Sequence, residues 1–181
     1  MNVFIAGPRQ VLNLEDPIQE RLHNIYEQGF TVLVGDAKGI DTSIQRYFYN
    51  LKYENIKVFA SQGKARNNIG NWAVENVLVA DNYKGFDYYA QKDKAMATEA
   101  NFGFMIWNGK SKGTLNNIIN LTKYKKQTLI YFIPKKEFLT IKNEENLINL
   151  VKSCDEETIK LYKKLSKSKQ NKKNIEISFK F

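Results

Sequence analysis

Two glycine-rich turns constrain this chain more than any other feature, because each lies between a short apolar run and a helical pattern. The first turn, GDAKGID, covers residues 35–41 and follows the apolar run 30–34. The second, GKSKGT, covers residues 109–114 and follows the apolar run 102–107. A turn from a strand into a helix leaves backbone N–H groups at the positive helix end, where they can hold a phosphate or another anion. Two such turns in one small chain indicate a nucleotide-type ligand.

Short apolar runs alternate with helical patterns along the first three quarters of the chain. Near-continuous apolar strands that alternate with helices are typical of a parallel sheet covered on both faces. We therefore expect an α/β fold, a Rossmann-like open and mainly parallel sheet with helices on both faces. The predicted strands are 3–6, 31–34, 56–60, 102–107 and 128–133, and the predicted helices are 16–29, 41–51, 88–100 and 114–126. Residues 72–80 fit either a strand or a helix.

Local signals refine this prediction at the helix ends and in the tail. Asp16 and Asp41 are expected to cap the helices that follow them. We expect residues 1–134 to form the nucleotide-binding domain, and residues 135–181 to form a helical, lysine-rich extension packed on the same domain. Residues 147–151 and 159–165 are predicted to form one or two packing helices. An alternation of apolar residues predicts a terminal strand at a sheet edge: Ile175, Ile177, Phe179 and Phe181.

Composition excludes several classes of protein. One cysteine, Cys154, cannot form an internal disulfide, and with a single histidine, His23, no Cys/His metal cluster is possible. No apolar run approaches the roughly 20 residues of a membrane span, and no leader segment is recognisable. We expect a cytoplasmic protein in a reducing compartment, with no cofactor, no metal and no membrane partner.

The chain is basic, with 28 Lys and Arg residues against 19 Asp and Glu residues and a net charge of +9. Most of the excess lies in the second half, and lysines are dense from Lys160 onward. A basic block of this kind can bind phosphate backbones, or it can simply be a solvated helix face. We favour solvation, with at most weak, sequence-independent nucleic-acid binding through the lysine-rich C-terminus.

Ligands of open parallel sheets bind at the carboxyl ends of the strands. The loops expected at those ends combine glycine with positive charge, which suits a phosphate-bearing ligand. Asp41, the acidic residue at the start of the second predicted helix, and Trp107, at the end of a predicted strand, are also candidates. The candidate ligand-binding residues are Gly7, Arg9, Gly35, Asp36, Lys38, Gly39, Asp41, Lys64, Arg66, Asn67, Trp107, Gly109, Lys110, Ser111, Gly113 and Thr114.

Several of these segments resemble the SLOG superfamily, which includes DprA-type DNA-processing proteins, cytokinin-activating Lonely Guy enzymes and YspA-like proteins. GDAKGID resembles the superfamily turn G-G-A-x-G-x-D, and residues 63–68 resemble the G-K-x-A-G-x-x-R-N segment of the YspA-like branch. Residues 96–100 and 102–114 resemble that branch's M-x-x-x-A-D strand followed by W-x-G-x-S-x-G-T. The resemblance spans about residues 3–133. It implies a Rossmann-like sheet, nucleotide-derived ligands, frequent homodimers or higher homo-oligomers, and roles in phage defence or counter-defence signalling.

One departure from the superfamily bears on catalysis. Relatives that cleave N-glycosidic bonds carry a glutamate three residues after the G-T pair, and Asn117 stands at that position here. An amide cannot act as the carboxylate nucleophile of such a reaction. The remaining candidate carboxylates are Asp36, Asp41 and Glu99, of which Glu99 is expected at the wrong end of its strand.

We therefore expect a protein that binds a nucleotide or nucleotide-derived signalling molecule, as a sensor or a sequestering protein, and no catalytic residue. Two alternatives stay open. One is an N-glycosidase or deoxyribosyltransferase-like enzyme acting on nucleoside monophosphates. The other is a DprA-like nucleic-acid-binding module.

Overall fold

The computed structural model describes residues 1–63 and 65–178, with side chains up to Lys167. Its centre is one sheet of seven strands, ordered β4-β3-β2-β1-β5-β6-β7. The strands are β1 (Asn2–Ala6), β2 (Thr31–Gly35), β3 (Ile56–Ser61), β4 (Ala73–Val77), β5 (Phe102–Trp107), β6 (Thr128–Phe132) and β7 (Glu137–Ile141). All neighbouring pairs are parallel except β6 and β7. The expected α/β class with a mainly parallel open sheet is confirmed.

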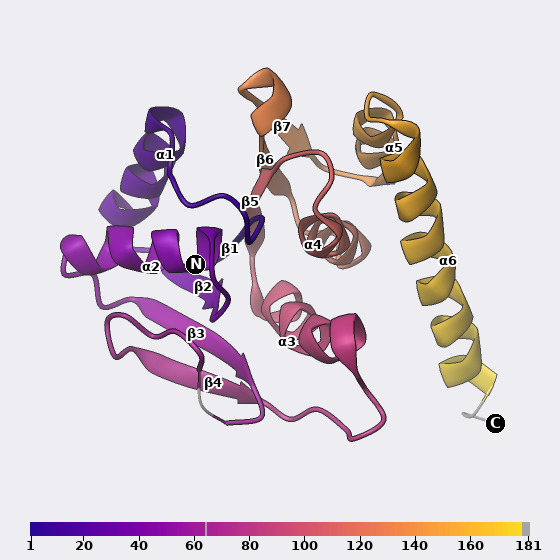
Figure 1. The fold of residues 1–181 in the computed structure, drawn as a ribbon, viewed down its shortest axis with the longest axis horizontal. Helices are drawn as coiled ribbons and strands as arrows, with labels where there is room; N and C mark the ends of the chain where they lie inside the picture. The colour runs from indigo at the N-terminus through magenta and orange to yellow at the C-terminus, as the bar shows by residue number, and fades with distance from the viewer. Residues whose placement is uncertain (64, 179–181) are drawn as a thin grey trace.

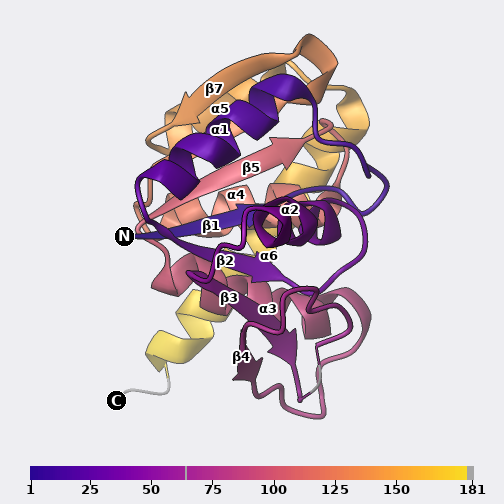
Figure 2. The same cartoon turned by 90° about the vertical axis from the view of Figure 1, so that its left-hand side faces the viewer.

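The order of the strands locates the point where the chain reverses direction across the sheet. From β1 the chain adds β2, β3 and β4 on one side, and β5 then pairs with the other side of β1. The loops that follow β1 and β5 therefore diverge, which opens a crevice at their carboxyl ends. Figure 2 shows β1 and β5 as neighbouring central strands that point the same way.

Helices cover both faces of the sheet, as Figure 1 shows. One face carries α1 (Asp16–Glu27) and α2 (Ile40–Asn50); the other carries α3 (Gly85–Glu99) and α4 (Lys112–Lys123). Farther out on the second face lie α5 (Glu144–Lys152) and α6 (Glu156–Ser178), and α6 runs along the side of the molecule. A short 3-10 turn, η1 (Ile133–Lys135), connects β6 to β7.

The apolar side chains form one buried cluster on each face of the sheet. The cluster under α1 and α2 includes Leu22 and Phe48, and the cluster under α3 and α4 includes Trp107 and Ile118. Leu165 of α6 belongs to the second cluster. The extension after residue 134 is therefore packed against the same core as the sheet.

Two predicted helix caps differ from the structure. Asp16 is the first residue of α1, and the cap position belongs to Glu15. Asp41 lies in the first turn of α2, and the cap position belongs to Gly39. The left-handed conformation that Gly39 adopts, with φ of 84°, explains the second difference, because glycine reaches it without strain.

The C-terminal prediction is partly wrong. The helix α6 continues to Ser178, so Ile175 and Ile177 lie in a helix and not in a terminal strand. Phe179 and Phe181 lie outside the described residues. The edge beside β6 is taken by β7, a strand that was not predicted from the sequence. The ambiguous segment 72–80 contains the edge strand β4.

Candidate ligand-binding cavity

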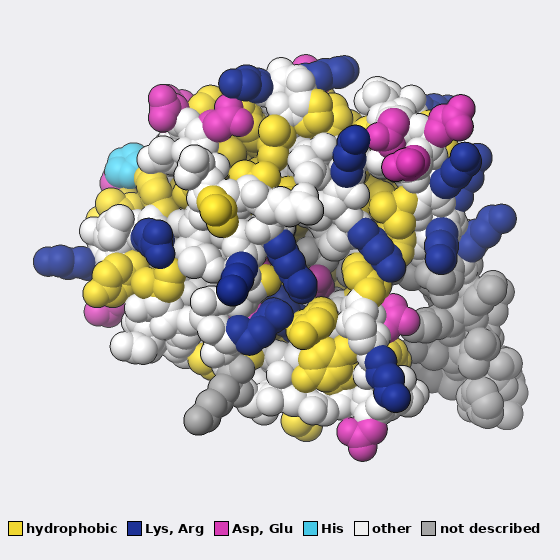
Figure 3. All heavy atoms as spheres, viewed as in Figure 1, with side chains coloured by type: hydrophobic (Ala, Val, Ile, Leu, Met, Phe, Trp, Pro, Cys, Tyr) yellow, Lys and Arg dark blue, Asp and Glu magenta, His cyan; other side chains and the backbone are white. Residues whose placement is uncertain are grey.

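A cavity of about 650 Å³ opens at the crevice between β1 and β5. The loops after β1, β2 and β5 form one side, and α3 and α4 form the other. On the face shown in Figure 3, basic side chains gather around a hollow in the middle of the molecule. Seven of the predicted ligand-binding residues line the cavity: Gly7, Arg9, Asp41, Lys110, Ser111, Gly113 and Thr114.

The second glycine-rich turn, residues 108–114, forms the part of the wall that we call the anion turn. Ser111 caps α4, and its hydroxyl oxygen accepts hydrogen bonds from Thr114 N at 3.4 Å and Thr114 Oγ1 at 3.0 Å. Asn108 Oδ1 accepts from the backbone N–H groups of Lys110 and Ser111 at 3.1 and 2.8 Å. Trp107 is fully buried, and its Nε1 donates to the Ser111 carbonyl at 3.3 Å. Trp107 thus supports the anion turn from the core and does not line the cavity.

The anion turn contains two backbone N–H groups, those of Lys112 and Gly113, that are available to an anion. The first N–H groups of a helix have no partner within the helix, and those of Lys112 and Gly113 find no acceptor among the described residues. A Cβ added at Gly113 would meet no heavy atom within 4 Å. The start of α4 is therefore open to the cavity, with two unpaired donors at the positive end of a helix.

The first glycine-rich turn is closed by the protein's own backbone. Ile40 N donates to the Pro8 carbonyl at 3.3 Å, and a Cβ at Gly39 would overlap the backbone of Arg9. The Asp41 carboxylate accepts from Ala37 N at 3.3 Å, inside the same turn. The loop after β1 therefore covers Gly39 and Ile40. Of this turn, Ala37 and Asp41 line the cavity, whereas Gly35, Lys38 and Gly39 do not.

Below the rim lies a group of charged side chains that we call the charge cluster: Asp36, Asp41, Arg66, Lys92 and Asp93. Asp36 receives two hydrogen bonds from the Arg66 guanidinium, at 2.9 and 2.6 Å, and one from Arg66 N at 3.1 Å. Lys92 Nζ lies 3.0 Å from Asp93 Oδ1 and 3.8 Å from Asp36 Oδ1. A Cβ at Gly35 would overlap both Asp41 Oδ2 and Lys92 Nζ, so Gly35 leaves room for this cluster.

Burial affects the members of the charge cluster differently. Burial raises the pKa of Asp41 to about 6; the charge of Lys92 opposes this increase, and those of Asp93 and Asp36 add to it. Burial would also raise the pKa of Asp36, but the hydrogen bonds from Arg66 and the charge of Lys92 hold it below its usual value. Burial would lower the pKa of Lys92, yet the three surrounding carboxylates raise it, so the ammonium stays charged.

Aromatic rings from α3 form the remaining wall. Tyr89 and Phe86 line the cavity. The guanidinium carbons of Arg66 and Arg9 lie 4.7 and 5.3 Å from the centre of the Tyr89 ring. Lys112 Nζ lies 3.8 Å from the centre of the Phe86 ring, which connects the starts of α3 and α4. These are cation–π distances, and the rings offer flat surfaces beside the anion turn.

Several of the predicted residues that do not line the cavity have structural roles nearby. Asp36 and Arg66 hold each other, and Asn67 Nδ2 donates to the Asp36 carbonyl at 2.9 Å. Lys38 is exposed, and Gly109 begins the anion turn with φ of 77°. Lys64 lies outside the described residues. Glu99 pairs with Lys57 at 2.7 Å, beside the start of β5 and away from the cavity, as its place in the chain predicted.

The sequence interpretation missed the contribution of α3. Four side chains along one face of that helix line the cavity: Phe86, Tyr89, Asp93 and Met96. Their spacing of three or four residues places them on one face of a helix. This spacing was the signal in the sequence that could have indicated the contribution of α3. Asp93 matters most, because it faces Asn117. When the side-chain amide of Asn117 is oriented with its nitrogen toward the acceptors, Nδ2 donates to Asp93 Oδ2 at 3.3 Å and to the Gly113 carbonyl at 3.2 Å.

Comparison with models of known protein families finds no match, and comparison with curated proteins finds none either. The resemblance to the SLOG superfamily therefore stays a prediction from the motifs. Among the described residues, no group of three or more His, Cys, Asp or Glu side chains could hold a metal ion, and every helix is too short or too polar to span a bilayer.

Proposed function

We propose that the protein binds a nucleotide or a nucleotide-derived signalling molecule in the cavity, with a phosphate at the anion turn. The observation that carries this proposal is the open start of α4: the N–H groups of Lys112 and Gly113 find no acceptor among the described residues, and a Cβ at Gly113 would meet open space. Lys110 and Lys112 add positive charge beside those donors. A volume of about 650 Å³ lies in the range of small-molecule sites.

The rest of the ligand is matched by the remaining walls. A base would lie against the Tyr89 and Phe86 rings, since aromatic side chains stack on the π-face of any base. The hydroxyl groups of a sugar would donate to the carboxylates of Asp41 and Asp93 on the floor. A role as sensor or sequestering protein, in phage defence or counter-defence signalling in the cytoplasm, is our proposal from the motif resemblance.

A pair of substitutions at one position tests the phosphate site. Gly113→Asp places a carboxylate where the phosphate should lie, while the first turn of a helix tolerates an acidic residue. Gly113→Ala adds only a methyl group in open space. We expect nucleoside 5′-monophosphates to raise the melting temperature of the wild type and of Gly113→Ala, because a ligand that binds only the folded state stabilises it. The Gly113→Asp variant should fold and show no such shift.

The ligand panel contains the four common nucleoside 5′-monophosphates, di- and cyclic nucleotides, the matching nucleosides and inorganic phosphate. If no phosphate-bearing compound shifts the wild-type midpoint at millimolar concentration, the proposal is wrong. A shift that Gly113→Asp retains would place the phosphate elsewhere.

A second function, cleavage or transfer at the N-glycosidic bond of a nucleoside monophosphate, is favoured by one observation. The cavity contains the Asp93 carboxylate beside Asn117, the position where related enzymes carry their glutamate. A carboxylate near the sugar is what such chemistry requires. This carboxylate was not among the candidates from the sequence, because Asp93 lies on α3 and not on α4, where the glutamate was expected.

Release of free base, followed by chromatography, distinguishes the two functions. For a binding protein we expect no release above the background rate. If the protein is an enzyme, Asp93→Asn should abolish release even at nucleotide concentrations that saturate the variant. Glu99→Gln is the matched control, because that carboxylate pairs with Lys57 outside the cavity. Release that Glu99→Gln abolishes and Asp93→Asn does not would exclude Asp93 as the reacting group.

A further inference from the structure

The helix α6 is attached to the anion turn by a buried hydrogen bond. Thr158 is 2% exposed, and its Oγ1 donates to the Gly109 carbonyl at 2.6 Å. The two residues are 49 positions apart in sequence, so this contact joins the C-terminal extension to the turn that shapes the anion site. Without this partner the buried carbonyl would lose a hydrogen bond that water could not replace.

Further contacts fix the start of α6 at the same place. Asp155 Oδ1 accepts from Thr158 N at 2.8 Å and so caps the helix. Its other carboxylate oxygen lies 3.8 Å from Lys110 Nζ, on the anion turn. One turn farther along, Ile159 and Tyr162 pack against the core cluster under α4, and Leu165 is buried within it. The helix is therefore held on both the anion turn and the helix that this turn begins.

The conformation of the anion turn depends on Gly109. Its φ of 77° is reached without strain only by glycine, and Lys112 and Gly113, whose N–H groups begin α4, follow three and four positions later. A hydrogen bond that fixes the Gly109 carbonyl consequently restricts where these two donors point.

We propose that Thr158 is a positioning residue for the anion site, and that ligand binding in the cavity and docking of α6 stabilise each other through it. This inference rests on the proposed phosphate site. Coupling between two sites is reciprocal: if docked α6 favours the binding-competent turn, an anion in that turn favours docked α6. The C-terminal extension then responds to the occupancy of the cavity.

Hydrogen exchange on the wild-type protein tests the coupling without any substitution. We expect saturating inorganic phosphate to slow the exchange of amides in residues 156–167, although none of the described residues of α6 lines the cavity. Phosphate that binds, by its shift of the melting temperature, and leaves exchange in this segment unchanged overturns the inference and leaves the proposed function in place. Inorganic phosphate that does not bind at all removes the inference, and the proposed function falls with it only if no nucleotide shifts the melting temperature either.

Two substitutions test the role of Thr158 itself. Thr158→Val keeps the shape and removes the donor, and Thr158→Ser keeps the donor. We expect Thr158→Val to bind inorganic phosphate roughly threefold to tenfold more weakly, as the loss of one hydrogen bond predicts, and Thr158→Ser to stay near the wild type. The matched control is Thr122→Val, which loses a hydrogen bond to Ile118 O within α4. Equal phosphate affinity of Thr158→Val and the wild type, both folded, refutes the positioning role.

Discussion

At the scale of single residues, the charge cluster shows how burial and pairing give neighbouring carboxylates opposite properties. Asp36 and Asp41 lie in one turn, yet Arg66 pairs only with Asp36. The pKa of Asp36 is therefore lowered and that of Asp41 is raised to about 6. Asp41 was expected to cap a helix, and its neighbours Lys92 and Asp93 come from α3. Their proximity depends on packing, which the sequence pattern does not contain.

The raised pKa of Asp41 predicts a specific pH dependence of stability. Between about pH 4 and pH 6 the folded protein binds a proton at Asp41 that the unfolded chain has already lost. This contribution to stability is complete below about pH 4 and is lost as the pH rises through 6. Asp41→Asn should remove that decrease, which amounts to at most about 3 kcal/mol.

Urea denaturation of both proteins from pH 4 to pH 7 measures the difference. Asp36 does not confuse the result, because a lowered pKa makes its stabilising contribution disappear only as the pH falls below about 4. Asp81→Asn, at an exposed loop position, is the control. Parallel pH profiles of the wild type and Asp41→Asn would show that Asp41 is ionised as in the unfolded chain.

Tyr89 gives a second prediction at this scale. If a base lies on its ring, Tyr89→Leu should weaken binding of a nucleoside monophosphate by about 1–3 kcal/mol, the range for base–aromatic stacking. Tyr89→Phe should bind nearly as well as the wild type. Calorimetry with inorganic phosphate is the decisive comparison: phosphate affinity should not change in Tyr89→Leu. An equal loss for both ligands would mean that the ring only shapes the anion turn.

At the scale of elements, the five central strands and the helices between them were predictable, whereas the edge strands β4 and β7 were not. Apolar runs located β1, β2, β3, β5 and β6 within a residue or two, because a buried strand needs consecutive apolar side chains. The loop after β1 occupies the start of α2 through Pro8 and Arg9, so two turns with similar glycine patterns differ in whether a ligand can reach them. Only the three-dimensional course of that loop distinguishes them.

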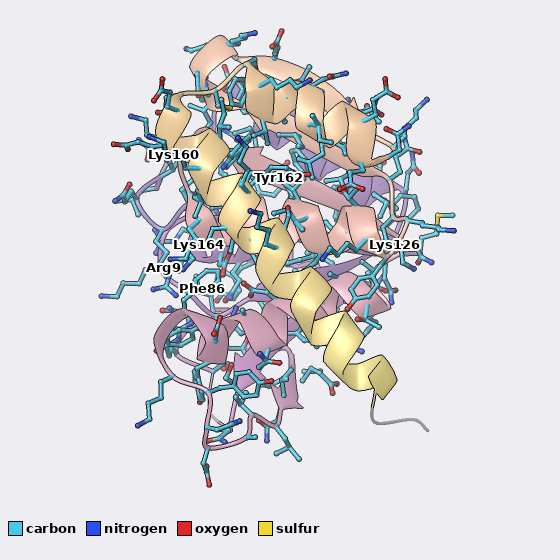
Figure 4. All side chains as sticks on the ribbon, turned by 90° about the vertical axis from the view of Figure 1, so that its right-hand side faces the viewer. Arg9, Phe86, Lys126, Lys160, Tyr162 and Lys164 are labelled. Atoms are coloured by element: carbon cyan, nitrogen blue, oxygen red, sulfur yellow. The ribbon has the colours of Figure 1, made fainter. Side chains whose placement is uncertain are left out.

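The helix α6 carries a row of exposed lysines, Lys160, Lys163, Lys164 and Lys167, which we call the lysine stripe. Their spacing places them on one face, and Figure 4 shows Lys160 and Lys164 on the same side of the molecule as Arg9 and Phe86. Lys160 pairs with Glu156 at 3.6 Å, an exposed pair of little strength.

We expect the lysine stripe to bind single-stranded DNA weakly and without sequence preference. The affinity should fall steeply between low and moderate salt, because neutralised phosphates release counterions. Lys164→Glu should weaken binding more than Lys126→Glu, a lysine on the opposite side in Figure 4. Fluorescence anisotropy measures both. A submicromolar, salt-resistant complex that survives replacement of all four lysines of the stripe by glutamate would favour the DNA-processing function.

At the scale of the whole molecule, the α/β class followed from the alternation of strands and helices, whereas the arrangement of the extension did not. By their apolar sequences alone, the helix after Thr114 and the region around Leu147 are candidates for a dimer interface. In the structure these faces are used within the chain: α4 is buried from Thr114 to Leu121, and Leu147 and Val151 belong to the core. A dimer must therefore use another surface.

The free edge of β4 is the surface we expect a homodimer to use. Val74 is 41% exposed and Leu78 is 84% exposed there, and an unpaired strand edge readily pairs with a second strand. Light scattering should give roughly 42 kDa for the wild type, twice the 21.0 kDa of one chain. Val74→Lys should give a monomer, and Leu12→Lys, at an exposed position off the edge, should not. A monomeric wild type would remove this prediction and leave the cavity unaffected.

The charges around the cavity change from positive at the rim to mainly negative at the floor. The start of α4 with Lys110 is positive at the rim, whereas two of the three charged side chains that line the floor are carboxylates, Asp41 and Asp93, beside Lys92. A ligand with an anion at one end and hydrogen-bond donors at the other meets favourable charge at both ends. A nucleoside 3′,5′-bisphosphate would have to bring its second phosphate toward these carboxylates. If a nucleotide binds as proposed, this arrangement favours one orientation, with the phosphate at the rim and the sugar hydroxyl groups at the floor.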